Sequence, residues 1–163
     1  MNEKYTIKFA GLEDLDSWML MIESVRTNFP GLDTEELLES YKQTVIKNIS
    51  RQTAICAKHA NEVVGVLIFS YNAKCLSCMA VHPEHRRKGI ATAMMKDMLS
   101  LFPSDVDISV TTFRENDSKG IAPRPLYNKF GFVEDELVEE FNLPHQKFVL
   151  HRTQTSKETG SLG

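Results

Sequence analysis

The first third of the chain contains one strand-like repeat and two helical repeats of apolar residues. Over residues 5–9 apolar and polar side chains alternate, which predicts a strand. Over 12–29 and again over 38–49 apolar residues recur every three or four positions, which is typical of amphipathic helices. Asp33 and Glu36 have the spacing of a capping-box variant, so we expect the second helix to begin there.

The middle third predicts three strands followed by a third helix. Apolar runs over 54–58 and 63–69 are separated by a short polar segment, a spacing that indicates a hairpin. Residues 75–81 follow as another strand. A strongly polar segment, 82–89, then leads into an apolar helical repeat over 90–102.

The last third predicts three more strands and one short helix. Residues 106–112 alternate and are rich in β-branched side chains, which favour a strand. A short helix is expected over 125–130, with Pro125 at its first position and Gly131 after its end. Two closing strands are expected over 133–141 and 147–152. A disordered polar tail is expected over 153–163. The order of elements is therefore β, αα, βββ, α, β, α, ββ.

Composition narrows the class of protein. A chain of 163 residues, 42% hydrophobic and 25% charged, suits one folded domain, which we expect over residues 1–152. The net charge of -3 argues against a surface built for nucleic acid. No apolar run approaches the roughly 18 residues of a membrane helix, and residues 1–10 alternate instead of forming a signal-peptide core. We therefore expect a cytoplasmic protein whose partners are neither nucleic acids nor membranes.

The cysteines do not predict a metal site. Cys75 and Cys78 form a Cys-x-x-Cys pair, but the pair lies within a predicted strand. Positions three apart on a strand point to opposite faces and cannot converge on one metal ion. Together with Cys56 they are interpreted as core or half-buried thiols.

The polar segment His82–Gly89 predicts an anion-binding site. A strand that leads through a turn into a helix leaves N–H groups unpaired at one place, where the helix dipole favours an anion. Gly89 and Ala91 are small enough to let a diphosphate approach the backbone. Positive charge is added by Arg86, Arg87 and Lys88. The patterns of a P-loop and of a dinucleotide-binding loop are absent, so a pyrophosphate site and a basic turn that only caps a helix are both open.

Three motifs in order resemble those of a known family. Arg86-Arg87-Lys88-Gly89-Ile90-Ala91 resembles the Arg/Gln-x-x-Gly-x-Gly/Ala signature of the GNAT superfamily of N-acetyltransferases. Val81-x-Pro83 before it and Leu126–Phe132 after the next strand resemble the neighbouring signatures of that family. The predicted order of elements also agrees with the family over residues 5–152.

The resemblance implies an α+β fold with a mixed, mostly antiparallel twisted sheet of about seven strands and four helices. It implies that the sheet opens between 75–81 and 106–112 and that acetyl-CoA, the co-substrate, lies there, with no metal. The pantetheine arm would pair with the main chain near Met79 and Val81, and the amides from Arg87 to Thr92 would hold the pyrophosphate. The implied binding residues are Met79, Ala80, Val81, Arg86, Arg87, Lys88, Gly89, Ile90, Ala91, Thr92 and Asn116.

The resemblance also implies catalysis by direct attack of a primary amine on the thioester in a ternary complex. Tyr127 stands where the family often has the tyrosine that protonates the leaving thiolate, although a tyrosine that fixes a helix to the core is the alternative. The family's carboxylate on the strand 75–81 is missing, so Glu115, His82 and an ordered water chain are open as the base. Gly120 replaces a usual asparagine, for which Asn116 could substitute if the loop carries an insertion.

The amine acceptor, a small molecule or a peptide, is not specified by any motif. The turn at 28–32 and the hairpin at 142–146 are expected to flank its site. An acidic cluster could attract a cationic amine or be a solvated strand face; it comprises Glu134, Asp135, Glu136, Glu139 and Glu140. A non-catalytic acyl-CoA-binding sensor is the alternative function, and the chain is expected to be a monomer or homodimer.

Overall fold

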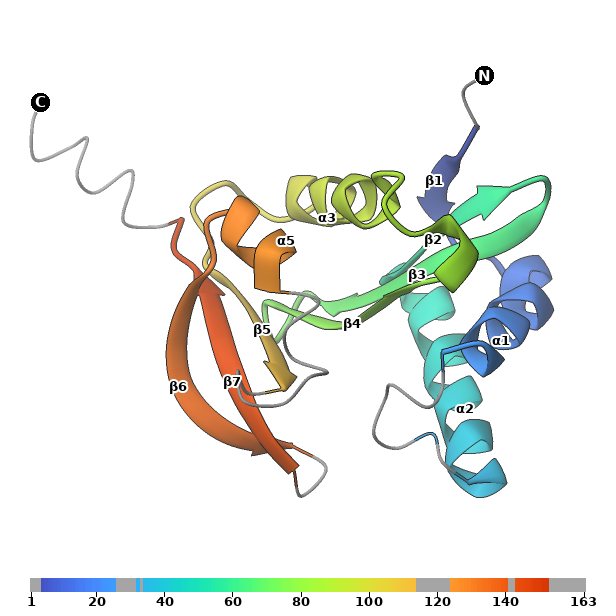
Figure 1. Cartoon of the computed structure of the whole chain (residues 1–163), viewed down its shortest axis with the longest axis horizontal. Coiled ribbons are helices and arrows are strands. Elements are labelled where there is room, and N and C mark those ends of the chain that lie inside the picture. Colours follow the sequence, from blue (N-terminus) through green and yellow to red (C-terminus); the bar gives the residue numbers. More distant parts are fainter. Residues whose placement is uncertain (1–3, 26–31, 33, 114–123, 141–142, 153–163) are drawn as a thin grey trace, which may run out of the picture. The chain divides into compact units, whose positions relative to one another are not determined.

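The computed structural model of the chain describes residues 4–25, 32, 34–113, 124–140 and 143–152 (Figure 1). Among these residues seven strands form a mixed sheet in the order β1-β2-β3-β4-β5-β7-β6. The strands are β1 Thr6–Phe9, β2 Ala54–His59, β3 Glu62–Ser70, β4 Cys75–Val81, β5 Ile108–Phe113, β6 Val133–Glu140 and β7 Leu143–Leu150. The helices are α1 Leu15–Glu23, α2 Glu35–Arg51, α3 Ile90–Ser100 and α5 Arg124–Lys129, with 3-10 turns η1 Leu12–Asp14 and η3 Pro83–His85.

Contacts within the chain define two compact units. The first unit comprises residues 1–69 and 78–99, and the second comprises 70–77 and 100–163. The first contains the predicted anion-binding segment and the second contains Tyr127. The expected single domain over 1–152 therefore stays a prediction.

In the first unit, helices cover both faces of the strands β2 and β3. Figure 1 shows α3 on one face and α1 with α2 on the other. Gly65 of β3 lies under α3, and a Cβ there would stand only 2.9 Å from Cγ2 of Ile90 and 3.1 Å from Cε of Met94. The glycine therefore allows the helix that follows the polar segment to pack closely on the sheet.

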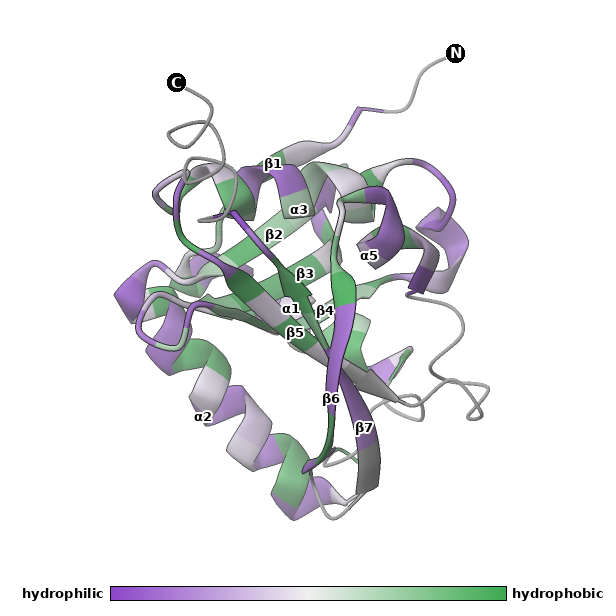
Figure 2. Cartoon of the chain, turned by 90° about the vertical axis from the view of Figure 1, so that its left-hand side faces the viewer, coloured by the Kyte–Doolittle hydropathy of each residue, from purple (hydrophilic) through white to green (hydrophobic). Residues whose placement is uncertain are grey.

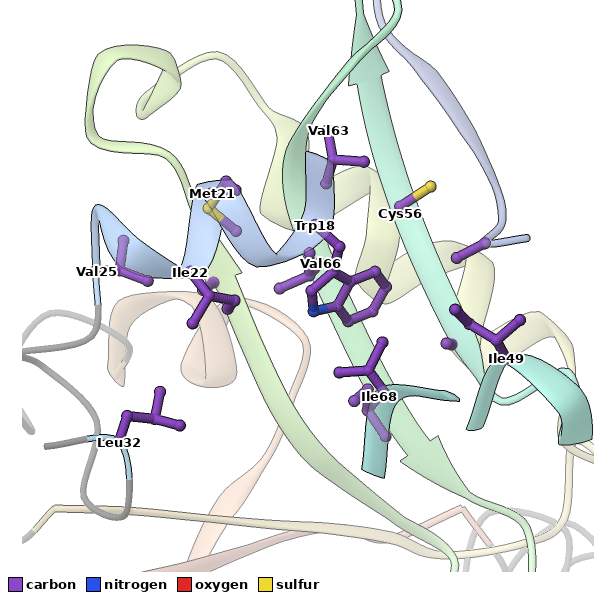
Figure 3. Close-up of a cluster of buried hydrophobic side chains, with 14 residues drawn as sticks. Trp18, Met21, Ile22, Val25, Leu32, Ile49, Cys56, Val63, Val66 and Ile68 are labelled. Atoms are coloured by element: carbon purple, nitrogen blue, oxygen red, sulfur yellow. The ribbon is translucent and has the colours of Figure 1, made fainter. Parts of the chain in front are cut away.

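The opposite face of these strands carries the core of the first unit (Figure 3). Trp18 of α1 is fully buried, and Figure 3 shows its indole beside Val66 and Ile68 of β3. Its Nε1 donates a hydrogen bond to the hydroxyl of Tyr41 on α2 at 3.1 Å, so the buried N–H has a partner. The hydropathy of α2 alternates along its length (Figure 2), as expected for a helix with one buried face.

A buried carboxylate fixes the start of the chain to β2. The side chain of Asp14 is fully buried and accepts hydrogen bonds from Nζ of Lys8 at 2.6 Å and of Lys58 at 2.7 Å. Burial raises the pKa of Asp14, but the backbone N–H of Gly11 and the two ammonium groups outweigh burial and lower that pKa to about 2. One side chain thereby connects β1, η1 and β2.

The second unit is built on β5, β7 and β6. Both β5 and β6 pair antiparallel with β7, whereas the start of β4 pairs parallel with β5 at Cys75 and Leu76. The helix α5 ends before Gly131, whose φ of +93° is readily adopted only by glycine.

In the first unit, the predicted end of the first helix and the predicted start of the second helix were wrong. The first helix extends only to Glu23, where the hydroxyl of Ser24 donates to the carbonyl of Met21 and competes with a further turn. Its predicted residues 26–29 lie outside the described residues. The N-cap of α2 is Thr34, whose Oγ1 accepts from the N–H of Leu37 at 3.1 Å. Asp33 is not that cap and lies outside the described residues.

Further boundaries shift by a few residues. The third helix ends at Ser100, and β5 begins at Ile108 because Val106 forms a turn with Pro103. The short helix begins one residue early, which places Pro125 at its second position.

The strand β7 begins at residue 143, four residues before the predicted start at 147. Periodicity failed here because the polar residues His145 and Gln146 are buried. Nε2 of Gln146 donates to the carbonyl of Asp135 at 3.0 Å, so the buried amide is satisfied. The segment 143–146, expected in the hairpin beside the acceptor, is therefore part of a strand.

Candidate functional site

The polar segment after β4 folds into a short turn fixed to the sheet. His82 is the N-cap of η3, and its Nδ1 accepts a hydrogen bond from the N–H of Glu84 at 3.1 Å. The N–H of His82 donates to the carbonyl of Val64 on β3 at 2.8 Å. Pro83 occupies the first position of the turn, where it has no N–H to leave unpaired. The sequence thus starts a turn directly after the strand.

Two residues between η3 and α3 have positive φ angles. Arg87 has a φ of +65° and Gly89 a φ of +81°, both in the left-handed region. A Cβ added at Gly89 would meet no atom within 4 Å, so the glycine faces open space. A hollow of about 180 Å³ lies here, lined by Val81, His85, Arg86, Arg87, Gly89, Ile90, Ala91 and Thr92. The first N–H groups of α3, which have no partner within the helix, lie beside a hollow that could hold a phosphate group.

The charge around the hollow is positive. The side chains of Arg86, Arg87 and Lys88 are exposed next to it. Nε of Arg86 donates to the carbonyl of Val81 at 3.2 Å, which connects the loop to the end of β4. Helix-dipole and side-chain charge therefore act in the same direction, and the hollow suits an anion.

The end of β4 leads straight into this hollow. Ala80 is buried in the core cluster, so the neighbouring positions Met79 and Val81 face away from it. In the described residues, the paired positions of β4 with β5 are Cys75 and Leu76. The main chain of Met79 and Val81 thus lies beyond the part of β4 that pairs with β5. The opening expected between β4 and β5 would lie between the two units and stays a prediction.

Tyr127 occupies a buried aromatic cluster in the second unit. It is 6% exposed, and its ring centroid lies 5.9 Å from that of Phe132 and 5.6 Å from that of Phe148. Arg124, one turn earlier on α5, places its guanidinium 5.0 Å from the Phe148 ring and pairs with Glu134 at 3.1 Å. The tyrosine clearly helps to pack α5, and its role as catalytic acid stays a prediction.

The remaining predicted site residues are not brought together by the described structure. Glu115, Asn116 and Gly120 lie outside the described residues. His82 uses Nδ1 in its own turn. The catalytic base therefore stays unassigned.

Cys56 is buried, whereas Cys75 and Cys78 are half-buried. Cys78 packs against the core cluster, and burial raises the pKa of its thiol to about 11. Burial likewise raises the pKa of Cys56 to about 11. Within the part of the chain that the structure describes, no three His, Cys, Asp or Glu residues are grouped to hold a metal ion.

Four members of the acidic cluster on β6 are exposed, and two of them are paired; the four are Glu134, Asp135, Glu136 and Glu139. Glu134 pairs with Arg124, and Glu136 lies 4.0 Å from Nζ of Lys147 on β7. These pairs are consistent with the interpretation as a solvated strand face. Attraction of a cationic amine stays a prediction.

Sequence reasoning missed a group of rings beside the loop. The hydroxyl of Tyr5 lies 3.1 Å from Nδ1 of His85, and the ring of His59 contacts both. These residues come from distant parts of the chain, and no spacing in the sequence signals their meeting.

No described helix is long and apolar enough to cross a membrane.

Comparison with known proteins gives consistent similarities. Residues 50–134, just over half of the chain, match the family described as the acetyltransferase (GNAT) domain. The mouse cysteine-rich protein 2-binding protein is 30% identical over an alignment of 119 residues, and the match covers 69% of this chain and 13% of that protein. The chain thus corresponds to a small part of that relative's length.

Two solved structures are similar over nearly the whole chain. A GNAT-family acetyltransferase from Bacillus cereus is 25% identical with a TM-score of 0.71, over 91% of this chain and 98% of that one. The PaiA N-acetyltransferase from Thermoplasma acidophilum, solved in complex with coenzyme A, is 16% identical with a TM-score of 0.66. That match covers 88% of this chain and 98% of the other.

Proposed function

This chain belongs to the GNAT family of acetyltransferases, and we propose that it transfers the acetyl group of acetyl-CoA to a primary amine of a small molecule or peptide. The seven-stranded mixed sheet with four helices is the GNAT fold that the sequence motifs implied. The observation that carries the proposal is the positively charged hollow at the start of α3, where Gly89 leaves the backbone open.

Acetyl-CoA fits the chemistry of this hollow. The N–H groups from Arg87 to Thr92 would donate to the pyrophosphate oxygens, and the side chains of Arg86, Arg87 and Lys88 would add charge. The main chain of Met79 and Val81 would pair with the amides of the pantetheine arm, while Ala80 packs on the core side of the same strand. Asn116 is a further candidate contact outside the described residues.

The transfer would be direct. The nitrogen of a neutral amine attacks the thioester carbonyl carbon, the new N–C bond forms, and the C–S bond then breaks. The amine loses a proton to a base, for which Glu115, His82 and water are the candidates, and the thiolate gains a proton from Tyr127. The products are the N-acetylated amine and coenzyme A.

The state of two cysteines, Cys56 and Cys78, supports direct transfer. An acyl-enzyme would need a reactive thiolate, which requires a low thiol pKa and access. The pKa values of Cys56 and Cys78 are both raised to about 11 by burial, so these thiols remain protonated at neutral pH. Neither is suited to accept the acetyl group before the amine.

The test is release of free thiol from acetyl-CoA in the presence of a panel of primary amines and amine-bearing peptides. We expect thiol release that depends on one class of amine and on enzyme concentration, with mass spectrometry showing a gain of one acetyl group on that amine. Tight acetyl-CoA binding without transfer to any amine would instead support the acyl-CoA sensor. Failure to bind acetyl-CoA at all would contradict both.

A further inference from the structure

Four aromatic and imidazole rings meet directly beside the hollow. The ring centroid of His85 lies 5.3 Å from that of His59, 5.7 Å from His82 and 5.8 Å from Tyr5. Tyr5 in turn lies 5.2 Å from His59. We call Tyr5, His59, His82 and His85 the ring cluster. Tyr5 directly precedes β1 and His85 ends η3, so their contact brings the turn after β4 beside the start of β1.

The ring cluster restrains His85 from several directions. The hydroxyl of Tyr5 hydrogen-bonds to its Nδ1 at 3.1 Å. The rings of Tyr5 and His82 meet it edge-on, at interplanar angles of 88° and 79°. His59 is itself held, since its Nδ1 lies 3.1 Å from the carbonyl of Lys4. These contacts leave the half-buried His85 ring few alternative rotamers.

His85 is also the last residue of η3 and lines the hollow. The next four residues are exposed, and two of them have positive φ angles. A conformation that is intrinsically unfavourable for Arg87 persists only if its surroundings fix it. The ring cluster fixes the residue from which this part of the loop starts, while Ile90, the buried first residue of α3, fixes its other end.

We propose that the ring cluster is a positioning device for the phosphate-binding loop, through which Tyr5 and His59 set the affinity for the pyrophosphate. This inference rests on the proposed function, because it concerns the same hollow. A loop fixed before binding loses less conformational entropy when the anion arrives, so disorder at His85 should weaken binding of the pyrophosphate specifically.

The experiment compares two ligands that differ in the pyrophosphate. Acetyl-CoA contains it, and S-acetylpantetheine does not. The Kd of acetyl-CoA is measured by calorimetry and that of S-acetylpantetheine by ligand-observed NMR, neither of which requires turnover. For His85→Ala we expect acetyl-CoA to bind about tenfold more weakly, with binding of S-acetylpantetheine unchanged.

Graded variants separate positioning from general packing. Tyr5→Phe, which keeps the ring and removes the hydroxyl, should weaken acetyl-CoA binding about threefold. His85→Phe keeps a ring in the cluster and should recover most of the affinity that alanine loses. Tyr71→Ala is the matched control, because it removes a ring of the Tyr71–Phe102 pair in the second unit and should change neither Kd.

Each outcome decides the inference. Wild-type affinity of His85→Ala for acetyl-CoA, or equal weakening of both ligands, would overturn the positioning role and leave the proposed function standing. Absence of acetyl-CoA binding by the wild-type protein would remove the proposed function and this inference with it. Selective weakening that His85→Phe reverses supports the ring cluster as a positioning device.

Discussion

The segment His82–Thr92 presents main-chain N–H groups and exposed cations, whereas the helix α5 presents one buried phenol among aromatic rings. The first arrangement depends on backbone angles at Arg87 and Gly89, and its residues 86–89 are exposed. The second depends on side-chain packing, since Tyr127 is in contact with Phe132 and Phe148. The two regions belong to different compact units.

This difference decides what each region reveals about function. Gly89 combines a φ of +81°, which favours glycine, with open space in which a ligand would meet the backbone. A buried tyrosine in an aromatic cluster is already explained by packing, so its burial says little about catalysis. The proposed binding step is therefore supported by the structure of one region, and the proposed acid step still depends on a kinetic test.

The largest effect is expected at the loop. In Gly89→Glu the new side chain would enter the space that the pyrophosphate needs and would bring a negative charge beside it. Losing two or three hydrogen bonds to an anion corresponds to a Kd for acetyl-CoA that is about a thousandfold higher, as measured by calorimetry.

Two controls test whether the effect comes from the hollow. Gly89→Ala keeps the open space, because a Cβ meets no atom within 4 Å, but strains the φ of +81°, so it should lose far less affinity than Gly89→Glu. Gly131→Ala places a residue at a similar positive φ in the second unit and should leave the Kd unchanged. Equal acetyl-CoA binding by wild type and Gly89→Glu would show that the hollow does not hold the pyrophosphate.

A smaller effect, on turnover, is expected at α5. Tyr127→Phe keeps the ring contacts with Phe132 and Phe148 but removes the proton donor, so kcat should fall about a hundredfold while the Kd of acetyl-CoA changes little. Steady-state kinetics and calorimetry on the same preparation give both values. Unchanged kcat would leave Tyr127 with a packing role only and would sharpen the contrast between the two regions.

The smallest effect is expected on folding stability, when the buried charged residue of each unit, Asp14 or Arg124, is replaced. Asp14→Asn removes the shared partner of two lysines whose side chains are 34% and 23% exposed, so solvent offsets part of the loss. We expect the free energy of unfolding at pH 7 to fall by about 2 kcal/mol in urea titrations. Arg124→Met, whose partner Glu134 is largely exposed, should cost less.

The pH dependence of stability gives an independent check on Asp14. Its pKa in the folded protein, about 2, lies below the ordinary value of 3.8, so ionised Asp14 stabilises the fold above about pH 4. That stabilisation is lost progressively as the pH falls from about 4 towards 2. Wild type should therefore lose more stability than Asp14→Asn over this range. Parallel curves for the two proteins would contradict the assigned role.

Most of the fold could be predicted from local patterns, and the errors have physical causes. The order of strands and helices follows from periodicity and from the turn residues. The start of β7 was missed because Gln146 is polar but buried. Its side-chain amide is satisfied by hydrogen bonds to the backbone of β6, and a hydropathy pattern does not register such bonds. The cap of α2 was misplaced by one residue because Asp33 and Thr34 are both suitable N-caps.

The sequence alone determined the order of the elements and predicted the anion-binding turn, because both depend on residues close together in the chain. Val81, Pro83 and Gly89 favour the end of a strand, a turn and the start of a helix. Only the tertiary structure brought Tyr5 to His85 and Asp14 to Lys58, which are 80 and 44 residues apart. Such meetings depend on strand register and on packing over the whole sheet, and no short pattern encodes them.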